Sequence, residues 1–288
     1  MDGALEPRDR PSMRRGVGPT LLLGPALLLF VVLFVYPQIW MAGTSLEAPN
    51  WTFRHFGRFL GDGHYLATLG RSLMLGAVVT LLTVLLGFPL AYWLARWDNR
   101  LASALVILST FPLWVSAVVR SFGWIVLLGR GGVVVALLSA LGMTGQSAQL
   151  LYTLTGVVIA LTQVLLPFMV LSLYGVIRSV DPEIERAAQN LGASPFKAVL
   201  LTTIPLAGQG ILSASLLVFA LAISAFATPS LVGGARVQLM STTIYEQMAE
   251  LADWRFAAAV SFILLAVVLA ISLVQMRIGS GPEERVVR

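Results

Sequence analysis

The stretch Asp181–Pro205, DPEIERAAQNLGASPFKAVLLTTIP, carries charge and helix punctuation between two long apolar segments. Asp181 followed by Pro182 is typical of a helix start, because an aspartate caps free backbone N–H groups and a first-turn proline lacks one. Gly192 suits the left-handed residue just past a helix end. Ser194 then repeats the start signal before a second proline. The pattern predicts two short helices joined by a sharp turn.

The first of these helices carries both acidic and apolar side chains. Glu183 and Glu185 fall in its first turn, where the helix dipole favours negative charge. Its apolar residues recur with helical spacing and so share one face: Ile184, Ala187, Ala188 and Leu191. A charged helical hairpin between two membrane spans has the shape of a docking element. The alternative is an ordinary polar loop that happens to be helical.

The composition of the whole chain indicates an integral membrane protein. Of its 288 residues, 57% are hydrophobic and only 11% are charged, whereas soluble domains carry about 25% charged residues. Several apolar runs exceed the roughly 18 residues that mark a membrane span. The net charge of +5 comes from basic residues that are spread along the chain, which indicates membrane topology and no nucleic-acid partner. The expected fold class is therefore an all-α polytopic membrane protein in a lipid bilayer.

Six transmembrane helices are expected within a membrane domain over 20–277, flanked by tails over 1–19 and 278–288. Residues 122–149 are expected to form a helix and loop at the outer surface, and the alternative is an additional span or a re-entrant segment over 122–141. Arginine and lysine are more frequent in one set of connecting segments, and this bias predicts that both termini and the 181–205 hairpin lie inside the cell. The expected spans are 20–40, 73–94, 101–119, 150–177, 206–227 and 256–276.

The order of residues from Glu185 to Ser194, followed by Ile204-Pro205, resembles the EAA loop of ABC-importer permeases, E-A-A-x-x-x-G and later I-x-L-P. Arg186 stands where that pattern has glutamate, and Thr202 and Ile204 stand at its isoleucine and leucine. The resemblance implies that the hairpin inserts into a cleft on a cytoplasmic ATPase and transmits its closure to the membrane helices. It assigns this contact to Glu185, Arg186, Ala187, Ala188, Gly192, Ala193, Ser194 and Pro205.

ATP hydrolysis is not expected in this chain. A phosphate-binding loop needs G-x-x-x-x-G-K-[ST], but the only lysine, Lys197, follows Phe196. No cysteine is present, and no carboxylate pair, Ser-His-Asp set or metal-ligand spacing appears. We therefore expect neither an enzyme nor a cofactor or metal site of its own. The apolar spans carry almost no ionisable residue, which argues against a proton-coupled carrier.

Polar and aromatic residues within and beside the spans are candidates for a translocation path or gate. Each polar residue in a span is also explained by helix packing. A cationic solute would call for carboxylates and aromatic faces, which gather at Tyr245, Glu246, Glu250, Asp253 and Trp254 before the last span. The remaining candidates are Gln163, Ser224 and Phe226, with Ser109, Ser116, Ser172, Ser213 and Ser215 as further polar positions.

Two further stretches are similar to the spermidine/putrescine branch of these permeases: Phe111-Pro112-Leu113-Trp114 through Arg120, Trp124 and Leu128-Gly129, and Phe226-Ala227-Thr228-Pro229 through Gly233-Gly234. The resemblance implies a type I importer in a bacterial inner membrane, with a core of five helices. Its partners would be a second permease, an ATPase dimer that binds ATP and Mg, and an external substrate-binding protein. The solute would be a polyamine, with an opine, an aminophosphonate, iron or thiamine as alternatives. A secondary carrier or channel and a scaffold subunit are the rivals from other classes.

Overall fold

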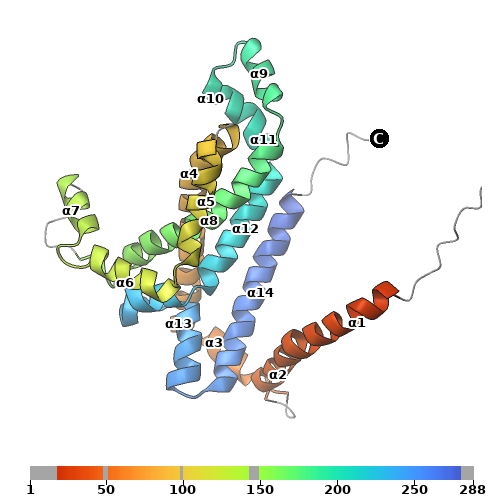
Figure 1. The fold of residues 1–288 in the computed structure, drawn as a ribbon. Helices are drawn as coiled ribbons and strands as arrows, with labels where there is room; N and C mark the ends of the chain where they lie inside the picture. Colours follow the sequence, from red (N-terminus) through yellow and green to blue (C-terminus); the bar gives the residue numbers. More distant parts are fainter. Residues whose placement is uncertain (1–17, 48–50, 98–99, 143–148, 280–288) are drawn as a thin grey trace, which may run out of the picture.

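The computed structural model describes residues 18–47, 51–97, 100–142 and 149–279, and every regular element in these ranges is a helix. Figure 1 shows a helical bundle with one arm on each side. The expected all-α class is confirmed. Most of the predicted tails, 1–19 and 278–288, lies outside the described residues.

Three long helices form the centre of the bundle: α4 (Gly63–Arg96), α8 (Leu154–Ser179) and α12 (Gly208–Ser224). Apolar side chains between them, such as Val79 and Met169, are fully buried. Glycines bring the backbones close, as is common between membrane helices. A methyl group at Gly210 on α12 would lie 2.4 Å from Val176 Cγ1 on α8. These contacts make α4, α8 and α12 one packed unit, and the hairpin and the bent segments are connected to it.

The N-terminal arm runs through α1 (Gly18–Phe30), η1 (Val31–Val35) and α2 (Tyr36–Ser45) and leans away from the bundle (Figure 1). Only α2 packs against the last helix, α14 (Trp254–Gly279). Leu28 and Leu33 on the arm are 69% and 67% exposed within this chain. Such a surface suits lipid or another membrane protein.

The segment expected to form the span 101–119 is bent. It consists of α5 (Arg100–Thr110) and η2 (Phe111–Trp114), and α6 (Ala117–Leu128) then leaves at 93°. Pro112 limits the helix and the backbone at Val115 and Ser116 is extended. A turn through Gly131, with φ of +72°, leads to α7 (Val133–Ala140). The expected helix and loop over 122–149 thus contains two short helices, and 143–148 lie outside the described residues.

A second bend precedes α12. Residues Pro195–Leu206 comprise α10 (Pro195–Ala198), η3 (Val199–Thr203) and α11 (Ile204–Leu206), and they meet α12 at 71°. Gly24–Ser45, Gly63–Arg96, Leu154–Ser179 and Trp254–Gln275 are long and apolar enough to cross a membrane. Counting each bent pair as one span gives six, which is the expected number.

Short helices gather at the end of the bundle opposite α9 (Pro182–Asn190) and α10 (Figure 1). Among them, α3 is held on the start of α14: Arg58 pairs with Asp253 at 3.0 Å and lies 4.1 Å from the centre of the Phe256 ring. Phe59 beside it is fully buried. This end is therefore ordered by specific contacts. Its helices are α3 (Arg54–Gly61), η4 (Pro229–Gly233), η5 (Gly234–Arg236), α13 (Met240–Tyr245) and η6 (Glu246–Glu250).

Candidate functional site

The hairpin over 181–205 has the helix–turn–helix form that its punctuation predicts. The Asp181 side chain accepts a hydrogen bond from the Glu183 backbone N–H at 2.9 Å, so it caps α9. Gly192 has a φ of +96° and its N–H bonds to the Gln189 carbonyl at 2.9 Å. Ser194 then caps α10. The chain thus turns sharply at Gly192, because only glycine adopts this backbone without strain.

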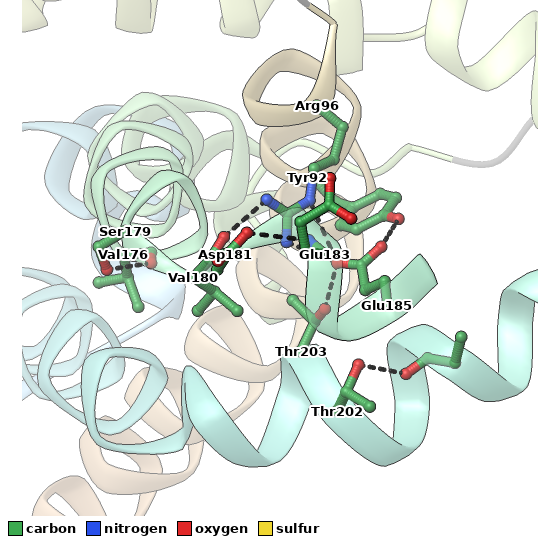
Figure 2. Close-up of polar contacts among 11 residues, drawn as sticks. Tyr92, Arg96, Val176, Ser179, Val180, Asp181, Glu183, Glu185, Thr202 and Thr203 are labelled. Carbon is green, nitrogen blue, oxygen red and sulfur yellow. Dashed lines mark hydrogen bonds and ion pairs between the residues drawn. The ribbon is translucent and has the colours of Figure 1, made fainter. Parts of the chain in front are cut away.

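Glu185 is buried at the base of the hairpin, with 5% of its surface exposed. Arg96 at the end of α4 donates to Glu185 Oε1 from Nη2 at 2.5 Å and from Nε at 3.1 Å. Tyr92 donates to Oε2 at 2.7 Å, and Thr203 in η3 donates to Oε1. Arg96 Nη1 also donates to the Val180 carbonyl at 2.8 Å. Figure 2 shows these five residues, which we call the Glu185 anchor.

The Glu185 carboxylate joins α9 to α4 and η3, and Arg96 adds the end of α8 through the Val180 carbonyl. Burial by itself raises the pKa of Glu185, but the hydrogen bonds from Thr203, Tyr92 and Arg96 and the charge of Arg96 hold it below its ordinary value. The carboxylate therefore stays ionised near neutral pH. A charge pair of this kind fixes geometry, since removing one partner leaves the other charge buried and unpaired.

The opposite side of the hairpin is open. Ile184 is 41% exposed, Leu191 91% and Phe196 77%. The expected apolar face of α9 is therefore not packed on this chain. Arg186 lies on the exposed surface and pairs with Glu183 at 2.5 Å. The hairpin thus combines a base held by polar contacts with an apolar tip that no part of the described chain covers.

The other residues that the similarity to the EAA loop assigns to an ATPase contact lie along the hairpin. Ala187 is exposed and Ala188 half-buried on α9, and Ala193 follows the turn, where its N–H bonds to the Ala188 carbonyl at 3.1 Å. Pro205 lies in α11, close to the 71° bend. The structure therefore divides this set between the tip, the turn and the connection to α12.

The residues proposed for a path or gate do not form one group. Gln163 accepts a hydrogen bond from Trp124 Nε1 at 3.1 Å, and Ser224 donates to the Ala220 carbonyl at 2.8 Å. Asp253 is bound to Arg58 and caps α14. Trp254 lines a separate apolar hollow beside α2. One set does gather around a single hollow, at the end of the bundle opposite the hairpin: Phe226, Tyr245, Glu246 and Glu250.

The sequence alone does not single out three residues of the Glu185 anchor: Tyr92, Arg96 and Thr203. The available signal was the spacing of Tyr92 and Arg96, which places them one turn apart at the end of a long apolar helix. Nothing in the local sequence indicates that their partner is Glu185, which lies 89 residues after Arg96.

The model of one protein family, described as "Binding-protein-dependent transport system inner membrane component", matches residues 83–278. This range contains the whole Glu185 anchor and the hairpin. Among curated proteins, the chain is 32% identical over 257 residues to the "Spermidine/putrescine transport system permease protein PotB" of Escherichia coli (strain K12). That match covers 86% of this chain and 93% of the relative.

A second relative transports a different kind of solute. The "Molybdenum transport system permease protein ModB" of Mycobacterium bovis is 34% identical over 212 residues, which cover 73% of this chain and 76% of the relative.

The fold is similar to that of a chain in the crystal structure of a bacterial alginate ABC transporter in complex with an alginate pentasaccharide-bound periplasmic protein. The TM-score is 0.75 at 18% identity, with 91% of this chain and 93% of that chain covered. The two chains therefore share a fold over most of their length. The match over residues 83–278 and the similarity to PotB together show that this chain belongs to the family of binding-protein-dependent inner membrane permeases of ABC importers.

Proposed function

We propose that this chain forms half of the membrane path of an ATP-driven importer and that its 181–205 hairpin docks on a cytoplasmic ATPase dimer. The main support is that the hairpin has an exposed apolar tip, where Leu191 is 91% exposed, and a base that the buried Glu185 fixes in place. A bound ATPase would cover the tip. When the ATPase moves, the hairpin would move with it, and the Glu185 anchor would transmit this movement to α4 and α8.

A second permease subunit is proposed to complete the path. The arm formed by α1, η1 and α2 and the arm formed by α6 and α7 leave the bundle on opposite sides (Figure 1). Both carry exposed apolar side chains, including Phe34 at 59% and Val126 at 74%. A partner of the same fold would cover such arms, and lipid would cover the remainder.

An external substrate-binding protein is proposed to deliver the solute, as in the alginate transporter whose structure includes a periplasmic protein. It would meet the end of the bundle that carries α3 and α13, because the hairpin occupies the other end (Figure 1). In this orientation both termini lie in the cytoplasm, in agreement with the arginine and lysine distribution.

A polyamine is the proposed solute. The support is the 32% identity to PotB, a spermidine/putrescine permease, over most of both chains. The other relative, ModB, is a molybdenum transport system permease and is 34% identical over a shorter range, so the polyamine assignment needs a direct test. ATP-dependent uptake of labelled spermidine by proteoliposomes that contain the complete transporter tests the assignment, and uptake of another solute in its place would overturn it.

Co-purification from the native membrane in mild detergent tests the subunit role. The unaltered chain should bring an ATPase, a second permease and a binding protein. Replacement of Leu191 by serine should release the ATPase and retain the second permease, because it removes apolar surface only at the tip. Asp62→Asn, at the opposite end, is the matched control and should retain all partners. A chain that purifies alone and moves solute without ATP would contradict the proposal.

A further inference from the structure

A hollow of about 260 Å³ opens at the end of the bundle opposite the hairpin, between the segment that runs from Phe226 through η4 and η5 and the segment formed by α13 and η6. One wall is aromatic: the rings of Phe226 and Tyr245 lie 4.6 Å apart between centroids, at an angle of 34°. The carboxylates of Glu246 and Glu250 line it as well, together with Gln238 and Thr242. The hollow thus offers negative charge beside an apolar aromatic surface.

Glu246 and Glu250 differ from the other acidic residues at this end. Glu47 is bound to Thr52 and His55, Asp62 caps α4, and Asp253 is bound to Arg58. By contrast, the side chains of Glu246 and Glu250 have no hydrogen bond or ion pair with any residue that the structure describes.

The backbone holds these two carboxylates near each other. They are the first and last residues of η6, a π-helical segment, and acids at this spacing on a helix repel each other. Single π-turns within helices are frequent at functional sites. A bound cation would relieve the repulsion, so the arrangement favours a positively charged ligand.

The lining also selects among cations. No group of three or more His, Cys, Asp or Glu able to hold a metal ion occurs within the described ranges. An alkylammonium group is satisfied by carboxylates and by the face of an aromatic ring. The methylene groups between the charges of a linear polyamine would pack on Phe226 and Tyr245. The chemistry therefore fits an organic ammonium better than a bare inorganic ion.

We propose that this hollow, lined by Phe226, Tyr245, Glu246 and Glu250, is a subsite that receives an ammonium group of a linear polyamine when the binding protein releases it. The inference rests on the proposed transport function. It adds that the solute contacts this chain at the hollow on its way across the membrane. Asp253 and Trp254 are not part of the subsite, since Asp253 is bound to Arg58 and Trp254 lines another hollow.

The test is photolabelling of the purified complex of permeases and ATPase, without binding protein, by a diazirine derivative of spermidine. The label should appear in the peptides that contain Phe226 and Tyr245–Glu250, and excess spermidine should remove it. Combined Glu246→Gln and Glu250→Gln should lower labelling roughly three- to tenfold, as expected for loss of two exposed charge contacts. Asp62→Asn removes a carboxylate from the same end and should leave labelling unchanged.

An uncharged diazirine diol of the same length controls for simple apolar binding. Equal labelling by the two probes, or equal labelling of the double variant and the unaltered chain, would overturn the subsite. Tyr245→Phe should retain labelling and Tyr245→Leu should weaken it, because only the former keeps the aromatic face.

The uptake experiment separates the two proposals. If the unaltered transporter imports spermidine but the hollow is not labelled, the subsite is wrong and the transport function stands. If it imports no polyamine, the proposed solute is wrong whatever the labelling shows, and the subsite as a step in polyamine import falls with it.

Discussion

The two ends of this molecule use glutamate in opposite ways. At the hairpin, Glu185 is 5% exposed and accepts hydrogen bonds from three side chains. At the other end, Glu246 and Glu250 face an open hollow and have no side-chain partner among the described residues. The comparison teaches that the surroundings decide what a carboxylate does: the paired one holds elements together, and the unpaired ones are the pair that we propose as a ligand contact.

The largest effect is expected where the buried pair is broken. Arg96→Met leaves Glu185 without its charge partner and should destabilise the chain by about 3–5 kcal/mol, which thermal unfolding in detergent measures. Arg186→Met removes an arginine from an exposed pair on the same hairpin and should cost at most about 1 kcal/mol. Equal losses in the two variants would mean that the Glu185 anchor does not hold the hairpin.

Acid should weaken the same anchor by protonating Glu185. Its pKa is lowered from the ordinary value of 4.5, so the folded state binds this proton less readily than the unfolded state. The stabilisation is fully present above pH 4.5 and is lost as pH falls below it toward the folded pKa. Unfolding measured between pH 7 and pH 3 should show this loss, and Glu185→Gln should lack that part of the pH dependence.

A smaller effect is expected at the turn. Gly192 has a φ of +96°, but a methyl group there would meet nothing within 4 Å. Gly192→Val should therefore cost about 1–2 kcal/mol through backbone strain alone. ATPase association should weaken because the tip is misdirected. Gly192→Asn should cost less, since asparagine tolerates the left-handed region. Normal ATPase association by the valine variant would contradict the role of the turn.

The smallest effect on stability is expected at the outer hollow. Glu246→Gln and Glu250→Gln remove unpaired charges and should change the free energy of unfolding by less than about 0.5 kcal/mol. A slight gain is the expected direction because like charges on one helix repel. A loss as large as that of Arg96→Met would show that these carboxylates are structural and would remove the contrast between the two ends.

Local chemistry was sufficient to predict the hairpin. Asp181, Gly192 and Ser194 act within a few residues of their own positions, and the structure has each cap and the turn where the sequence indicates them. The bends were not predictable in the same way. Pro112 signals a limit to the helix, but the 93° turn depends on the extended backbone at Val115 and Ser116 and on the packing around it.

The polar contacts of the sites were harder to predict than the helices. Glu185 looked like one of several acids in a first helical turn, and its burial depends on Arg96 and Tyr92 from another helix. Residue type alone suggests Phe226, Tyr245 and Glu246 as residues of a path or gate, and these three do line one hollow. Residue type also suggests Asp253, but that side chain is bound to Arg58, which lies 195 residues earlier. Such pairings are tertiary contacts and leave no local pattern.

The Glu185 anchor also sets an order for biogenesis. Arg96 leaves the ribosome 89 residues before Glu185, and Thr203 follows Glu185 by a further 18. The contact between Arg96 and Glu185 therefore forms only after the second half of the protein has begun to be made. The base of the hairpin is complete only once synthesis has passed Thr203, so under the proposed function a chain that ends before Thr203 would present the ATPase with a tip that lacks this anchor.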